Sequence, residues 1–327
     1  MLYDAAYIAL LERGLRTCLP DWDLPGDAPV RLLAVSENAT FLLERPEAPL
    51  VFRVQRPGYN SEAEILSELA WVAALRADGA VHAPAPVPCR SGAALSRFAA
   101  DGTEMLVTAF EYFPGVPPDE TGDLVQWFGA LGGVTARLHL HARAWTPPAG
   151  FARRTWDWDS CIGPDADWGD WRIAPGLGRE GIALLERAVL RLRAITDAYG
   201  RAPDRWGLIH SDMKPGNLLA QEDRLAVIDF DDCGQGWFMV DFAGSVSALE
   251  ADPRYGECLA AWLDGYRRVA PLAAEHEAMI PAFVMLRRIQ LSAWAATHSE
   301  TPFGQVAGGG FAQDTLALAE RFLSQHA

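Results

Sequence analysis

The first third of the chain carries apolar residues at about every second position, which is the period of β-strands. Runs of this kind occupy residues 30–35, 39–44, 50–56, 92–99 and 104–113. Residues that favour turns separate the runs, as expected between antiparallel strands. The pattern predicts a small five-stranded antiparallel sheet.

Two helices are predicted in the same part of the chain. Residues 1–15 repeat apolar positions with a helical period, and the acidic residues Asp4 and Glu12 argue against a signal peptide. Ser61 and Glu64 have the spacing of a capping box, in which each side chain bonds the other residue's backbone N–H. We therefore expect a helix to begin at Ser61 and to pack against the sheet.

From Asp123 onwards the helical period dominates. Residues 123–143 and 179–200 predict two long amphipathic helices. Residues 145–176 between them are rich in Trp, Asp, Gly and Pro, and these tryptophans either pack onto the helices or form a box around a cation; packing is favoured. Because strand signals return only briefly after residue 206, the chain is expected to be an α+β protein with a sheet lobe, a larger helical lobe and a ligand cleft between them.

Composition and charge exclude several classes of protein. The chain has 327 residues, with 28 Lys and Arg against 43 Asp and Glu, so its net charge is −15. An acidic chain is a poor binder of nucleic acids and of anionic membranes, and it suits a neutral or cationic partner. The five cysteines form no C-x-x-C pair, so neither a disulfide framework nor a zinc site is indicated. Arg287 and Arg288 interrupt the most apolar late segment, so no membrane span is expected and a cytoplasmic location is predicted.

The stretch "LIHSDMKPGNLL" places four polar side chains between apolar pairs: His210, Asp212, Lys214 and Asn217. Burying such groups without partners is costly, so their grouping indicates a specific task. An apolar run follows and ends in Asp229, twelve residues after Asn217.

These residue types in this order suit phosphoryl transfer. That reaction needs a carboxylate to orient a hydroxyl and to accept its proton, a role available to Asp212. It also needs hard oxygen ligands for Mg²⁺, which Asn217 and Asp229 can provide. The alternative is a polar turn that only satisfies its own backbone; the spacing and the flanking strands favour the phosphoryl-transfer interpretation.

The motif "HSDMKPGN" followed by "VIDFDD" resembles the catalytic and metal loops of the aminoglycoside phosphotransferase and choline kinase superfamily. The similarity is greatest to the phosphotransferase enzyme family that includes type II homoserine kinase and stress response kinase A, and it extends from about Val30 to about Arg288. It implies a protein-kinase-like two-lobed fold. Residues 1–110 would form the nucleotide-binding lobe, 111–122 the hinge, and 123–327 the helical lobe with both loops and the acceptor site.

The resemblance implies roles for the residues of the two loops. Asp212 corresponds to the catalytic base, and Asn217 and Asp229 correspond to the Mg²⁺ ligands. Lys214 either stabilises the phosphoryl group in transfer or is a solvated loop lysine. Structural support is assigned to His210, which braces the loop, and to Asp241, which accepts backbone N–H bonds from it.

The same resemblance implies the nucleotide contacts. They are Ser36 and Asn38 on the phosphates, Arg53 clamping the phosphates with Glu68 as its partner, and the backbone of Phe110 and Tyr112 on adenine. Arg53 and Glu68 could instead form an ordinary surface ion pair. Asp231 and Asp232 either contact the acceptor or lie around the metal loop without touching it.

The predicted function is therefore ATP- and Mg²⁺-dependent transfer of the γ-phosphate to a hydroxyl of a small molecule. The acidic surplus favours an acceptor with an amine, such as an amino alcohol, a hydroxy amino acid or an amino sugar. Two alternatives stay open: a protein Ser/Thr kinase of the stress-response type, and a non-catalytic nucleotide-binding module. The interval from Asp229 to Asp241 is too short for a peptide-docking activation segment, which favours the small-molecule kinase.

Overall fold

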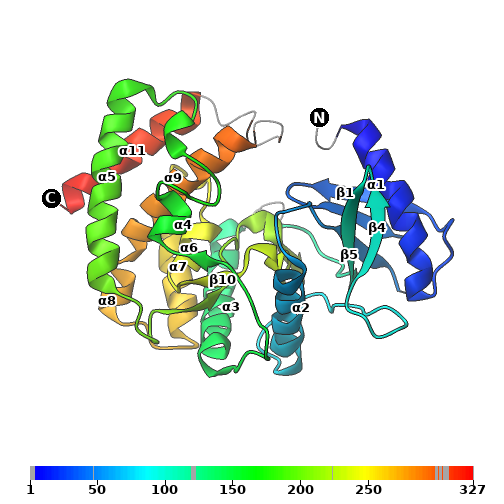
Figure 1. The fold of residues 1–327 in the computed structure, drawn as a ribbon. Helices are drawn as coiled ribbons and strands as arrows, with labels where there is room; N and C mark the ends of the chain where they lie inside the picture. Colours follow the sequence, from blue (N-terminus) through cyan, green and yellow to red (C-terminus); the bar gives the residue numbers. More distant parts are fainter. Residues whose placement is uncertain are drawn as a thin grey trace. The chain divides into compact units, whose positions relative to one another are not determined.

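The sheet predicted in the first third of the chain is present in the computed structural model (Figure 1). It is antiparallel, with the order β1-β2-β3-β5-β4. Its strands are β1 (Val30–Val35), β2 (Ala39–Leu43), β3 (Leu50–Val54), β4 (Ser96–Ala100) and β5 (Thr103–Glu111). The structure describes residues 4–46, 48–118, 123–222, 224–298, 301, 304 and 309–326.

Contacts within the chain define two units. Unit 1 comprises Met1–Val116, Thr146–Arg153 and Leu219–Asp231; unit 2 comprises Pro117–Trp145, Arg154–Leu218 and Asp232–Ala327. Two short segments of the later chain therefore belong to the unit that contains the sheet. The predicted lobe boundaries at residues 110 and 122 stay predictions.

One face of the sheet packs against helix α1 (Ala5–Cys18), which contacts β4 (Figure 1). Asp4 caps α1 by accepting the backbone N–H of Tyr7 at 2.9 Å. Phe41 and Phe52 point into the core on this face and are fully buried with the apolar side of the helix. The amphipathic pattern of the first residues is thus explained by packing inside unit 1.

Helix α2 (Glu62–Ala77) begins at the predicted capping box, in which Ser61 and Glu64 bond each other's backbone. Its apolar residues Ile65 and Leu69 form a small core with Leu95, against which Phe110 of β5 is partly buried. The register aligns Thr40, Arg53 and Thr108 across three strands, so these side chains share one sheet face. Because this face alternates with that of Phe41 and Phe52, Arg53 points away from the core under α1.

Unit 2 is mostly helical, and its two closest helices are α3 (Leu124–Ala144) and α7 (Tyr255–Arg267). A side chain at Gly265 would overlap the backbone of Gly129, so this contact requires glycine. The remaining helices described in this unit are α4 (Trp158–Ile162), α5 (Gly178–Tyr199), α6 (Val240–Ser245), α8 (Ala274–Glu277), α9 (Ile280–Thr297) and α11 (Gly309–Gln325). Helix α9 lies against α4, α5, α6 and α11, and it carries buried polar residues as well as apolar ones.

Short strands support the predicted loops. Strands β6 (Thr155–Trp156), β10 (Gly234–Trp237) and β7 (Trp206–Ile209) form a three-stranded sheet in the order β6-β10-β7, and β8 (Leu218–Gln221) pairs with β9 (Arg224–Val227). Strands β6 and β10 were not predicted. Two residues are too few to show a period, and the glycines of β10 hide its alternation.

The Trp-rich segment contributes to the core of unit 2. Trp156, Trp168 and Trp171 are buried, and the rings of Trp156 and Trp168 meet edge to face with centroids 5.6 Å apart. Burial of this kind is what the packing interpretation of the segment requires. A box for a cation would need exposed ring faces, which these three side chains do not offer.

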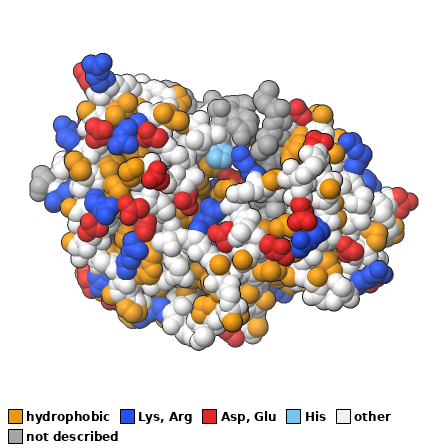
Figure 2. Space-filling model, viewed as in Figure 1, with side chains coloured by type: hydrophobic (Ala, Val, Ile, Leu, Met, Phe, Trp, Pro, Cys, Tyr) orange, Lys and Arg blue, Asp and Glu red, His pale blue; other side chains and the backbone are white. Residues whose placement is uncertain are grey.

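The surface drawn in Figure 2 intermixes acidic and basic side chains, so the net charge of −15 is not gathered into a single patch on that face. All five cysteines are buried with free thiols. Among the described residues, no helix is long and apolar enough to cross a bilayer.

Candidate active site

The polar loop after β7 is held in place by a buried carboxylate. Asp241 of α6 accepts the backbone N–H groups of His210 at 3.3 Å and Ser211 at 2.6 Å. His139 of α3 bonds the same carboxylate at 3.0 Å, and Asp241 is fully buried. Ser211 adopts a left-handed backbone with φ 74°, which those hydrogen bonds stabilise.

Helix α6 approaches this loop closely because residue 244 is a glycine. A Cβ atom at Gly244 would lie 2.5 Å from the carbonyl oxygen of Ser211 and 3.4 Å from Cα of Asp212. Asp212 is positioned by His210, whose Nδ1 accepts the Asp212 backbone N–H at 3.3 Å. These contacts hold the backbone of Asp212 independently of the contacts that its side chain makes.

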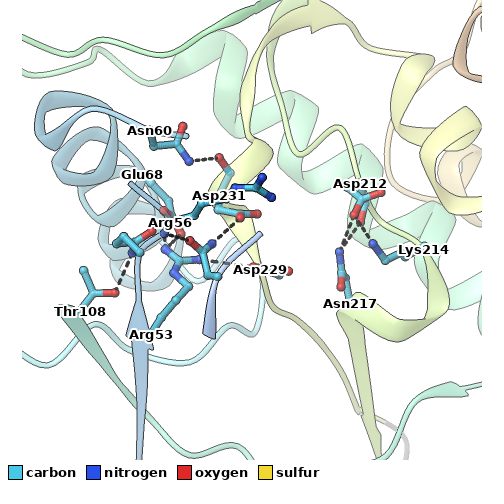
Figure 3. Close-up of polar contacts among 12 residues, drawn as sticks. Arg53, Arg56, Asn60, Glu68, Thr108, Asp212, Lys214, Asn217, Asp229 and Asp231 are labelled. Atoms are coloured by element: carbon cyan, nitrogen blue, oxygen red, sulfur yellow. Dashed lines mark hydrogen bonds and ion pairs between the residues drawn. The ribbon is translucent and has the colours of Figure 1, made fainter. Parts of the chain in front are cut away.

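Three side chains donate to the Asp212 carboxylate, and all of them lie in unit 2. Oδ2 accepts hydrogen bonds from Lys214 Nζ at 2.6 Å and from Asn217 Nδ2 at 2.9 Å (Figure 3). Oδ1 accepts one from Arg287 Nη2 of α9 at 2.6 Å. Asp212 is 6% exposed and Arg287 is 2% exposed. A buried carboxylate with three charge-assisted or amide donors is a fixed anion.

The pKa of Asp212 reflects these neighbours. Burial alone would raise the pKa, but Lys214 and Arg287 favour the charged form and together lower it to about 2. The carboxylate is therefore ionised at neutral pH. It can accept a hydrogen bond from a hydroxyl and fix the direction in which the hydroxyl oxygen presents its lone pairs.

The sequence did not predict the contribution of Arg287. In the sequence, Arg287 indicates only that its segment does not span a membrane, although a cation inside an apolar helical segment is itself a signal of a buried partner. A buried arginine needs an anionic partner, and Asp212 provides it. Which partner it finds depends on how α9 packs, and a periodic pattern does not encode that.

A second group of predicted residues comes together in unit 1. Arg53 Nη2 contacts both carboxylate oxygens of Glu68 at 2.6 Å, and the two side chains are 6% and 2% exposed (Figure 3). Arg53 Nη1 lies 3.4 Å from Oδ1 of Asp229. Burial lowers the pKa of Arg53, but Glu68, Asp231 and Asp229 outweigh it and raise the pKa. The Arg53–Glu68 pair is therefore buried and is not a surface ion pair.

Asp229 and Asp231 differ in their surroundings. Asp229 has a left-handed backbone with φ 62°, and its side chain is 33% exposed. Asp231 is buried, and its carboxylate accepts from Asn38 Nδ2 at 2.8 Å. Its carbonyl oxygen accepts from Asn60 Nδ2 at 3.2 Å and from the Arg153 guanidinium. Asp231 thus connects the loop after β1, the start of α2 and the segment before β6.

The other predicted nucleotide contacts lie at the ends of the strands. Ser36 is exposed in the turn between β1 and β2. Asn38 is buried, with Oδ1 accepting the backbone N–H of Arg56 at 2.9 Å, so both ends of its amide are bonded inside unit 1. Phe110 pairs with Val51, and the Tyr112 N–H donates to Pro49 at 3.1 Å. The phosphate and adenine roles of these residues stay predictions.

Asp232 begins the next segment of unit 2 and is also buried. Its carboxylate lies 3.9 Å from Arg154, and its carbonyl oxygen accepts from Trp156 Nε1 at 2.6 Å. Both residues predicted as acceptor contacts are therefore bonded within their own units, and the acceptor role of each stays a prediction.

Among the described residues, one group has the spacing of a metal site: Asp204, Glu275 and His276. Arg205 already pairs with Asp204 at 3.0 Å and with Glu275 at 3.4 Å. A guanidinium between two carboxylates explains why they are close, so this cluster needs no metal.

Comparison with known proteins places the chain among phosphotransferases. The sequence profile of the phosphotransferase enzyme family matches residues 30–272. A solved structure described as a microcompartment-associated aminopropanol kinase is 42% identical, covers 95% of this chain and 97% of its own, and superposes with a TM-score of 0.88.

More distant relatives share the fold. The amicoumacin kinase of Bacillus subtilis is 24% identical over 217 residues, which are 65% of this chain and 61% of that protein. A solved amicoumacin kinase in complex with AMP-PNP, Ca²⁺ and Ami is 20% identical, has a TM-score of 0.75 and covers 99% of this chain and 94% of its own. These similarities confirm the predicted superfamily and the predicted two-lobed α+β fold.

Proposed function

Because the chain belongs to the phosphotransferase enzyme family, we propose that it is a kinase that transfers the γ-phosphate of ATP to a hydroxyl of a small, amine-bearing molecule, with Mg²⁺ as the metal. The observation that carries the proposal is the Asp212 carboxylate, which is buried, ionised and bonded to Lys214, Asn217 and Arg287. An ionised carboxylate held in one place by three donors can orient a hydroxyl group and accept its proton.

We assign the proton-accepting role to Asp212. An acceptor hydroxyl that donates to this carboxylate is oriented for attack, and its proton passes to the carboxylate as the new P–O bond forms. Lys214 ends 2.6 Å from the same carboxylate on a side chain that is 47% exposed, so it can reach the phosphoryl oxygens. Backbone bonds from His210 and Ser211 to Asp241 keep the loop in this shape.

We assign the divalent cation to Asn217 of unit 2 and Asp229 of unit 1, each of which has an oxygen suited to it. Asn217 turns its amide nitrogen to Asp212, so its oxygen points away from the base, and Asp229 presents a partly exposed carboxylate. Amide and carboxylate oxygens are the ligands that Mg²⁺ prefers. Bound Mg²⁺ would neutralise charge on the transferred phosphate. Arg53, held by Glu68, adds a fixed guanidinium for the phosphates.

The acceptor class rests on two supports. The chain is acidic, which favours a cationic molecule over a neutral one. The relative that is 42% identical is described as an aminopropanol kinase, and aminopropanol is an amino alcohol. We therefore place amino alcohols first among acceptors, ahead of hydroxy amino acids and amino sugars.

A matched pair of acceptors tests the proposal directly. The purified protein is incubated with ATP, MgCl₂ and either 1-amino-2-propanol or 1,2-propanediol, in which a hydroxyl replaces the amine. ADP release and the ³¹P spectrum of the product are measured. The proposal predicts Mg²⁺-dependent formation of a phosphate monoester, with a kcat/KM at least ~10-fold higher for the amine, the effect of about 1.4 kcal/mol of added recognition.

Two outcomes would contradict parts of the proposal. Equal kcat/KM for the two acceptors would show that the amine is not recognised, while kinase activity on a hydroxyl would still stand. ATP turnover that occurs only when protein from a cell extract is added, and with none of the small acceptors, would instead support a protein kinase. A control with Asp212→Asn separates contaminating activity from the activity of the protein itself.

A further inference from the structure

The Asp212 carboxylate is held differently on its two oxygens. Oδ1 faces Arg287, which is 2% exposed and belongs to the helix at the core of unit 2. Oδ2 faces Lys214, whose side chain is 47% exposed, and Asn217. A molecule arriving from solvent can therefore reach Oδ2 by exchanging with the lysine, whereas Oδ1 is closed off by a buried cation.

Arg287 is itself fixed on every side. Its Nη1 donates to Oε1 of Gln290 at 3.2 Å, and its Nε donates to Oγ of Ser247 at 3.4 Å. The ring of Trp168 covers the guanidinium at 4.9 Å. A planar cation with three hydrogen-bonded nitrogens and a stacked ring has one available orientation. The arginine is thus a rigid anchor, while Lys214 is a partly exposed partner.

We propose that Arg287 is a positioning residue: it fixes Oδ1 of Asp212 so that Oδ2 is presented to the acceptor hydroxyl. The inference rests on the proposed function, because it concerns the same carboxylate. It adds a residue from α9 to a site that sequence motifs confine to the loops after β7 and β9. Misplacing a reacting group by about 1 Å can cost on the order of 10²-fold in rate, so the anchor has a measurable effect.

The adjacent residue provides a matched control. Arg288 is also buried on α9, and it pairs with Glu250 at 2.7 Å and with Thr315 at 2.8 Å. Its hydrogen-bond partners lie on α11 and after α6 and do not include Asp212. Replacing either arginine removes a buried cation from the same helix, but only one of the two replacements frees the catalytic carboxylate.

The test compares Arg287→Met, Arg287→Lys and Arg288→Met with the wild type by steady-state kinetics and thermal unfolding. Arg287→Met should lower kcat by about 10²-fold while the KM for ATP changes by less than about 3-fold, because the anchor acts on the acceptor step. Arg288→Met should lower the Tm by a similar amount but keep kcat within about 3-fold of the wild type. Arg287→Lys should have a Tm close to that of the wild type but a kcat at least ~10-fold lower, because lysine restores the positive charge but not the planar guanidinium with its paired donors.

Three results would overturn the inference. The first is near-wild-type kcat in Arg287→Met, and the second is equal loss of kcat in both methionine variants, which would mark a general loss of structure. The third is full recovery of kcat by Arg287→Lys, which would show that charge alone suffices. Wild-type protein without any phosphotransfer would overturn the proposed function itself, so the two failures are distinguishable.

Discussion

The buried Arg53–Glu68 pair supports a prediction about metal binding. In Glu68→Ala, Arg53 keeps two anionic neighbours, Asp231 and Asp229, and Oδ1 of Asp229 already lies 3.4 Å from its Nη1. We expect the guanidinium to turn towards Asp229 once the two 2.6 Å contacts to Glu68 are gone. The variant would then neutralise the carboxylate proposed to hold Mg²⁺. Loss of the glutamate should therefore weaken Mg·ATP binding and not only loosen the clamp.

The size of the effect follows from burial. Arg53 and Glu68 are 6% and 2% exposed, and removing one partner of such a buried pair costs about 3–5 kcal/mol. Asp229 offsets part of this cost, so we expect a loss near 3 kcal/mol in the free energy of unfolding. That corresponds to a Tm lower by roughly 6–12 °C. Binding of a Mg·ATP analogue should weaken by about 10-fold if ~1.4 kcal/mol of the metal interaction is lost.

The assay is calorimetric titration with Mg·AMP-PNP at several MgCl₂ concentrations, together with thermal unfolding. Glu62→Ala on the same helix is the control, because its pair with Arg97 is 46% exposed on both sides and should contribute less than ~1 kcal/mol. A Mg²⁺ requirement unchanged in Glu68→Ala, despite the lower Tm, would refute the proposed turn of Arg53. Equal losses in the two alanine variants would mean that burial of the pair is irrelevant.

Further predictions concern the catalytic loop and the acceptor. Asp212→Asn should abolish turnover with little change in nucleotide affinity, whereas Asp229→Asn should weaken nucleotide binding and turnover together; kinetics and calorimetry separate the two. Gly244→Ala should destabilise the fold by about 1–3 kcal/mol and lower kcat, because the new Cβ would lie 2.5 Å from the Ser211 carbonyl oxygen. Gly256→Ala is the control: its new Cβ would have no atom within 4 Å, so it should change neither Tm nor kcat. The KM for an amine acceptor should rise with ionic strength more steeply than kcat falls, and a salt-independent KM would argue against charge steering.

The sheet and the first two helices were predictable because their signals are local. Alternation sets the strands, and the capping box at Ser61 marks where α2 begins, as the structure confirms. The loop motif likewise predicts roles for Asp212 and Asn217 without knowledge of the fold, and the structure brings their side chains together at 2.9 Å. These features depend on residues a few positions apart, which is the range over which sequence patterns are informative.

Contacts over long separations were not predictable in the same way. Arg287 bonds Asp212 across 75 positions, and Asn38 bonds Asp231 across 193. Neither partner carries a local signal for the other, since each is an ordinary polar residue until the packing of α9 or of the loop after β1 is known. The bond between Arg287 and Asp212 therefore emerged only from the structure.

The composition of unit 1 has a consequence for biosynthesis. The five strands of its sheet end at residue 111. Residues 219–231 must be added before the contacts of Asp229 and Asp231 and the bridge between His82 and Ala226 can form. On the ribosome, the chain must be translated through residue 231 before this unit can close. Until then the nascent sheet holds Arg53 and Asn38 without these later partners, which is a state prone to misfolding and to capture by chaperones. Slowing translation just after this point should raise the soluble yield more than slowing it after residue 116.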